Sequence, residues 1–216
     1  MIYQKILILE APWSDDIADT RATKEIYSSP ETLLSIHPEP VGIIQRPLVS
    51  STYLDDIDKF VALPCNQRGP NLVIISAHGT HSFVKRKGDM KHRREIEAFD
   101  RKINISTDIR ALNGKLGRTI FILDACEIGI RVESFRKASG ALGTIGFAKR
   151  VDWIDSSVFI LSLLLYLQQA GIFHLQRARK KTGVTQPRAQ TVFEAMISGS
   201  YRSLAESLDV KHSFGA

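Results

Sequence analysis

Five short apolar runs, separated by polar segments with helical character, are the feature that most constrains the fold of this chain. The runs are rich in Ile, Leu and Val and are continuous rather than alternating, which is typical of strands covered on both faces. We predict strands at Lys5–Leu9, Val41–Ile44, Asn71–Ala77, Arg118–Leu123 and Ala141–Phe147.

Helix candidates lie between these runs and after them. Tyr53–Leu63 carries apolar residues at helical spacing, and Thr107–Asn113 is expected to form a shorter helix. Ser156–Ala170 is expected to be a long helix with Asp155 or Ser156 as its N-cap. Alternation of strand and helix predicts a mostly parallel open sheet with helices on both faces, that is, a three-layer α/β/α sandwich.

The length and composition favour one globular domain. The chain has 216 residues, of which 44% are hydrophobic and 24% charged, an ordinary balance for such a domain. We predict a single domain over 1–216, with a core at about 3–170 and with 171–216 as an extension or the final elements. Helical segments are expected around Phe193–Ile197 and Ser203–Leu208.

The sequence gives no indication of export or membrane insertion. The first residues do not follow the order of a signal peptide, and the most apolar stretch, Val158–Leu167, is too short to span a bilayer. The chain has two cysteines, fewer than a disulfide-stapled secreted domain usually carries. We therefore expect a cytoplasmic protein without membrane association.

Two strand ends carry residues suited to nucleophilic chemistry. His78 and Gly79 follow the third apolar run, whereas Asp124, Ala125 and Cys126 close the fourth. Because ligands of open α/β sheets bind beyond the carboxyl ends of the strands, these residues would share one edge if the two strands are neighbours.

A cysteine beside a histidine is a known arrangement for acyl transfer. The thiolate of Cys126 would attack a carbonyl carbon, and His78 would promote the thiolate and protonate the leaving amine. Gly79 would allow a close backbone approach, and its N–H with that of Cys126 could form an oxyanion hole.

This pattern resembles the caspase-like cysteine peptidases, which include caspases, metacaspases, separases and bacterial relatives. In that group a His-Gly pair ends one strand and an Ala-Cys or similar pair ends the next, as His78-Gly79 and Ala125-Cys126 do here. His78 lies 48 residues before Cys126, close to the caspase spacing. The chain also resembles small bacterial proteins of this type. The resemblance implies a caspase-like sandwich and a cysteine endopeptidase.

The residues around the pair depart from the caspase pattern and suggest another specificity. Caspases have glycine two residues after the cysteine, whereas here Gly129 stands three after Cys126. Asp124 fits a metacaspase position that lines the pocket for a basic P1 side chain. The stretch Asp152-Trp153 lacks the arginine with which caspases hold an acidic P1 residue. With Asp124, Asp152 and Trp153 as substrate-binding residues, we expect cleavage after Lys or Arg.

Other interpretations of these residues stay open. Cys126 and His78 could each be structural, Asp124 a strand-end carboxylate or helix-cap partner, and Trp153 a core residue. Cys65 is expected to be a loop or core thiol. His78 and His81 have metal-ligand spacing, but no Cys/His set completes a tetrahedral site, so neither a metal nor another cofactor is expected. No nucleotide-binding glycine loop and no serine nucleophile elbow occur either.

Two basic clusters provide an alternative from a different class of function. They occur at Lys85–Arg94 and Arg177–Lys181, in a chain of net charge +6, and both are expected to be exposed loops or helix faces. A catalytically silent caspase-like scaffold could bind nucleic acid or an acidic protein through them. In a peptidase they would be candidate self-processing sites. Its partners would be a protein or peptide substrate and a separate sensor or activator protein.

Overall fold

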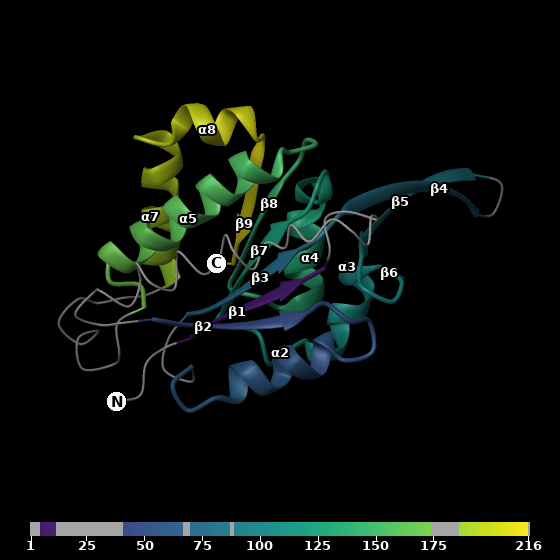
Figure 1. Ribbon diagram of the computed structural model, residues 1–216, viewed down its shortest axis with the longest axis horizontal. Helices are drawn as coiled ribbons and strands as arrows, with labels where there is room; N and C mark the ends of the chain where they lie inside the picture. Colours follow the sequence, from purple (N-terminus) through teal and green to yellow (C-terminus); the bar gives the residue numbers. More distant parts are fainter. Residues whose placement is uncertain (1–4, 12–40, 67–69, 87–88, 174–185, 216) are drawn as a thin grey trace, which may run out of the picture.

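A six-stranded, mostly parallel sheet forms the centre of the computed structural model, which describes residues 5–11, 41–66, 70–86, 89–173 and 186–215 (Figure 1). The strand order is β2-β1-β3-β7-β8-β9, and only β9 runs antiparallel to its neighbour. The strands are β1 (Lys5–Glu10), β2 (Gly42–Pro47), β3 (Asn71–Ser76), β7 (Thr119–Asp124), β8 (Gly143–Phe147) and β9 (Val210–Phe214). All five strands predicted from apolar runs are present.

Helices cover both faces of this sheet, which confirms the predicted three-layer α/β/α sandwich (Figure 1). On one face lie α2 (Tyr53–Ala62), α3 (Ile105–Asp108), the 3-10 helices η1 (Ile109–Leu112) and η2 (Ile128–Arg131), and α4 (Val132–Ser139). On the other face lie α5 (Trp153–Gln169), α7 (Gln186–Ser198) and α8 (Arg202–Ser207).

The core is divided between the two faces because successive side chains of a strand point to opposite sides. In β1, Leu7 and Leu9 belong to the cluster that contains α2 and α4, whereas Ile6 and Ile8 belong to the cluster that contains α5 and α7. All four side chains are at most 1% exposed. Burial on both faces explains why these strands read as continuous apolar runs.

Helix α5 begins earlier than the sequence suggested. We expected Asp155 or Ser156 as the N-cap, but the cap is Asp152, whose side chain accepts a hydrogen bond from the Ile154 N–H at 2.8 Å. Asp152 has extended backbone angles, which is the usual geometry of an N-cap, and the first helical residue is Trp153. Asp155 lies in the first turn, where a carboxylate is favourable toward the helix dipole.

We expected the first basic cluster to be an exposed loop or helix face, but its described basic residues at 85–86 and 91–94 belong to strands. These strands are β4 (Gly79–Arg86) and β5 (Asp89–Glu97), which form an antiparallel hairpin, and the short β6 (Lys102–Ile103) adds a third strand. This hairpin extends away from the sandwich as an arm (Figure 1). The second cluster, Arg177–Lys181, lies outside the described residues.

The last third of the chain contributes to the core and to the sheet. The two predicted helical segments correspond to α7 and α8, and Ala189, Phe193 and Met196 of α7 are buried against the α5 face of the sheet. Strand β9, which we did not predict, pairs with β8 from Gly143↔Phe214 to Phe147↔Val210.

The two sides of α5 provide a test of this packing. Leu163 is 0% exposed in the core, whereas Val158 is 48% exposed on the same helix. Leu163→Ala should lower the free energy of unfolding by about 2–5 kcal/mol because it leaves a cavity. Val158→Ala should change it by less than about 0.5 kcal/mol. Urea unfolding followed by circular dichroism measures both, and equal midpoints would contradict the packing described.

Candidate functional site

Strands β3 and β7 are neighbours in the sheet, and their pairing brings His78 and Cys126 to the same edge. The two strands run parallel with Ser76 opposite Asp124, and the Ala77 N–H donates to the Asp124 carbonyl at 3.0 Å. His78 and Cys126 each follow the last paired residue of their strand by two positions. The carboxyl ends of the two strands therefore deliver both residues together.

Gly79 makes the closest approach between the two strand ends. A Cβ atom built on Gly79 would lie 2.0 Å from the Cys126 carbonyl oxygen and 3.0 Å from the Cys126 nitrogen. No side chain fits there without moving the backbone, so the position requires glycine. The main chain that follows His78 is thus packed directly against the main chain of Cys126.

The thiol of Cys126 is free and half-buried. Its Sγ lies 3.7 Å from the carbonyl oxygen of Val151, in the connection between β8 and α5. Within the part of the chain that the structure describes, the Cys126 N–H donates to no backbone carbonyl.

His78 is half-buried and stands where the chain leaves the central sheet for the hairpin. Its carbonyl accepts a hydrogen bond from the Glu97 N–H at 2.9 Å, and Gly79 pairs with Ile96. The histidine backbone is therefore fixed by β7 on one side, through Ala77, and by the end of β5 on the other.

Glu127, which sequence reasoning missed, has an unusual backbone conformation directly after Cys126. Its φ of 58° lies in the left-handed region, which is uncommon for a residue with a side chain. Its N–H donates to the Lys149 carbonyl at 2.9 Å. Arg94 of β5 donates to its carbonyl at 2.9 Å and to its carboxylate at 3.0 Å. No sequence motif predicts the contact between Arg94 and Glu127, because the two residues are distant in sequence and the hairpin itself was not predicted.

Asp124 lies beneath the site rather than at its surface. The residue is 0% exposed, and one of its carboxylate oxygens accepts a hydrogen bond from the Ser76 hydroxyl at 2.8 Å. This contact joins the ends of β3 and β7. At 0% exposure, Asp124 does not offer its carboxyl group for direct contact with a ligand at the strand ends.

Asp152 and Trp153 lie at the start of α5, next to the carbonyl that faces Cys126. Asp152 is exposed and caps the helix, and Trp153 is half-buried as the first helical residue. Val151, whose carbonyl contacts the Cys126 thiol, immediately precedes them. Their position beside the strand ends is compatible with a role in contacting a ligand.

The packing of Gly129 explains why a glycine stands three residues after Cys126. A Cβ atom on Gly129 would lie 2.4 Å from the Phe147 carbonyl carbon and 2.6 Å from that of Gly146. The glycine is therefore needed for the approach of η2 to β8, and it supports the segment that follows Cys126 from below.

The second cysteine lies away from this edge. Cys65 is free, 7% exposed, and belongs to the turn after α2. Its burial agrees with the expected loop or core role. It can serve as an internal reference for the reactivity of Cys126.

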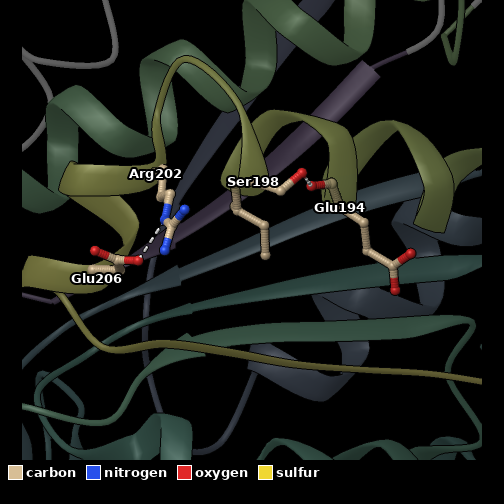
Figure 2. Close-up of a pocket in the computed structure, with 5 residues that line it drawn as sticks. Glu194, Ser198, Arg202 and Glu206 are labelled. Atoms are coloured by element: carbon tan, nitrogen blue, oxygen red, sulfur yellow. Dashed lines mark hydrogen bonds and ion pairs between the residues drawn. The ribbon is translucent and has the colours of Figure 1, made fainter.

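A cavity of about 370 Å³ lies elsewhere, between α7 and α8 (Figure 2). It is lined by Glu194, Ile197, Ser198, Arg202 and Glu206. Figure 2 shows Arg202 paired with Glu206, a helical contact of 2.7 Å one turn apart. The lining includes none of the residues predicted for the site.

Neither a cluster of metal ligands nor a membrane-spanning helix occurs in the ranges that the structure describes. Within those ranges, no three His, Cys, Asp or Glu side chains are gathered as ligands of a metal ion would be. None of the helices described there has the length and apolar character needed to cross a bilayer.

Comparisons with known proteins assign no family to this chain. No family model matches it, and no curated protein matches it. Among solved structures it is similar to the crystal structure of protein GSU0716 from Geobacter sulfurreducens, a structural genomics target. The identity is 13%, the TM-score is 0.45, and the match covers 98% of this chain and 92% of that one. At this level the similarity carries no argument about function.

The contact between Gly79 and Cys126 can be tested directly. Gly79→Ala places a methyl group against the Cys126 carbonyl and should lower the free energy of unfolding by about 1–3 kcal/mol or more. Gly117→Ala is the matched control, because a Cβ there meets no atom within 4 Å. Thermal unfolding of both variants measures the difference. A Gly79 variant as stable as the Gly117 variant would show that the two strand ends do not touch.

Proposed function

We propose that this chain is a cysteine endopeptidase of the caspase-like type, with Cys126 as nucleophile and His78 as general acid and base. The observation that carries the proposal is the packing of Gly79 against the Cys126 backbone at the paired ends of β3 and β7. This packing supports the proposal because the backbones of Gly79 and Cys126 are in contact directly after His78, as the family resemblance implies.

The chemistry follows from these groups. The Cys126 thiolate would attack the carbonyl carbon of the scissile peptide bond, and the oxyanion would be stabilised by the N–H groups of Cys126 and Gly79. The imidazolium of His78 would give its proton to the departing amine, which leaves a thioester on Cys126. Water, deprotonated by His78, would then hydrolyse the thioester and release the acid product.

The substrate in this proposal is a protein or peptide with a basic P1 residue. Two carboxylates favour this preference: Asp124 acts from below the strand ends, and Asp152 is exposed beside Val151. Trp153 would contribute a half-buried aromatic wall at the same place. A positive P1 side chain would gain Coulomb energy from both carboxylates, whereas an acidic one would lose it.

A reducing, cytoplasmic location accompanies the proposal. Both cysteines are free, and the proposed chemistry requires Cys126 as a thiolate rather than a disulfide. The trigger of activity would then come from a separate sensor or activator protein.

The proposed nucleophile can be tested with a thiol-reactive peptide probe that carries Arg or Lys at P1. Wild type should be labelled on Cys126, and Cys126→Ala should not be labelled. His78→Ala should react with the probe at least about 10²-fold more slowly than wild type, because the general base is lost. Cys65→Ala is the control and should label as wild type does. Mass spectrometry identifies the labelled residue, and a wild-type protein that ignores the probe and cuts no member of a peptide library would refute the peptidase proposal.

The proposed specificity is tested by Asp152→Asn, which removes the charge while asparagine can still cap α5. We expect kcat/KM for an Arg-P1 peptide to fall by about fivefold, which corresponds to about 1 kcal/mol of lost attraction between exposed charges. Cleavage of a neutral-P1 peptide should hardly change and serves as the control. An equal loss on both peptides would assign Asp152 a purely structural role.

A further inference from the structure

Arg94 joins the hairpin to the residue that follows the proposed nucleophile. Its Nη1 atom donates both to the carbonyl oxygen of Glu127, at 2.9 Å, and to the carboxylate of Glu127, at 3.0 Å. The Arg94 side chain is 15% exposed and that of Glu127 is 25% exposed. Charge-assisted hydrogen bonds with this degree of burial are stronger than exposed surface pairs.

Glu127 needs such contacts to hold its conformation. A left-handed backbone costs a residue with a Cβ about 1–2 kcal/mol, so surrounding interactions must maintain it. Its N–H is bound by the Lys149 carbonyl, and its own carbonyl is bound by Arg94. Arg150, whose side chain is 83% exposed, adds a longer contact of 3.6 Å to the carboxylate. Arg94 is thus the principal side chain that fixes the turn at Cys126.

The same hairpin also holds His78. Strand β4 begins at Gly79, and the end of β5 binds the His78 carbonyl through the Glu97 N–H. Arg94 lies three residues before Glu97 on that strand. One strand therefore carries both the contact that fixes the histidine backbone and the contact that fixes the turn after the cysteine.

The charge of Arg94 matters as well as its hydrogen bonds. Glu127 immediately follows Cys126 in the chain, and in general a carboxylate that lies near a thiol disfavours the thiolate. Arg94 lies at hydrogen-bond distance from that carboxylate and offsets its charge. Arg150, whose side chain is largely exposed, lies farther from the same carboxylate, at 3.6 Å.

We propose that Arg94 is a positioning residue of the site: it holds Glu127 in the left-handed turn and offsets its charge, so that Cys126 is presented as a reactive thiolate toward His78. This inference rests on the proposed peptidase function, which it deepens. It assigns to the hairpin a role that the sequence did not suggest.

The test measures the alkylation rate of Cys126 by iodoacetamide at neutral pH, with peptide mass spectrometry to separate it from the buried Cys65. Arg94→Met should slow alkylation by about tenfold, which corresponds to about 1.4 kcal/mol. Arg94→Lys, which keeps the charge and one donor nitrogen, should stay within about threefold of wild type. Glu127→Gln in the Arg94→Met background should recover most of the rate, because it removes the carboxylate charge that Arg94 no longer offsets.

Lys102→Met is the matched control. Lys102 forms an ion pair of 2.9 Å with Glu97 in the same three-stranded sheet, so its loss changes a charge of the hairpin without touching Glu127. It should leave alkylation of Cys126 unchanged. If Arg94 only supported the hairpin, Arg94→Met would lower the urea midpoint, and the added Glu127→Gln would restore nothing.

The outcomes separate this inference from the peptidase proposal. Alkylation needs no peptide substrate, so the Arg94 and Glu127 variants test the role of Arg94 even if wild type cuts no peptide. If wild type cuts peptides and Arg94→Met cuts and alkylates equally fast, the inference is wrong while the peptidase proposal stands. If Arg94→Met does not fold, Arg94→Lys and the single variant Glu127→Gln decide. The first must stay near the wild-type rate and the second must match or exceed it, and a tenfold loss in either overturns the inference.

Discussion

The register of β3 against β7 is the constraint on which the candidate site depends. Ser76 lies opposite Asp124, and the two continue in parallel until His78 and Cys126 emerge. A slip of one residue would turn the alternating side chains of β3 to the wrong faces, exchanging Val73 and Ile75 with Leu72 and Ile74 between the two core clusters. The packing of the whole core therefore fixes the position of His78 relative to Cys126 at the edge of the sheet.

The sequence predicts well those parts of the fold that are buried on both sides. Continuous apolar runs identify β1, β3, β7 and β8, because a strand between two helical layers has no polar face. Strand β9 was missed because it lies at the edge of the sheet, where Lys211, His212 and Ser213 are tolerated. The β4–β5 hairpin was missed for a related reason: its many charged residues have low strand propensity, and its pairing is local rather than core-driven.

The residues of the candidate site also fall into those that the sequence pattern could predict and those that it could not. His78, Gly79 and Cys126 could be found because buried strands end at them, and the sheet geometry then brings them together. The contact between Arg94 and Glu127 could not be found, since it depends on an unpredicted hairpin and on a left-handed turn that glutamate rarely adopts. The burial of Asp124 was equally out of reach, because sequence pattern does not tell a strand-end carboxylate at the surface from one beneath it.

The hairpin arm has a mechanical consequence. It leaves the sandwich at Gly79 and returns through Arg94 and Glu97, which contact Glu127 and His78 at the base of the arm. The far end of the arm, where Lys85 pairs with Met90, belongs to the three-stranded sheet and not to the central sheet. A pull or twist applied to that end would be carried along two hydrogen-bonded strands to the histidine and to the turn behind the cysteine. A displacement of the arm would therefore change the position of the backbone at the candidate site.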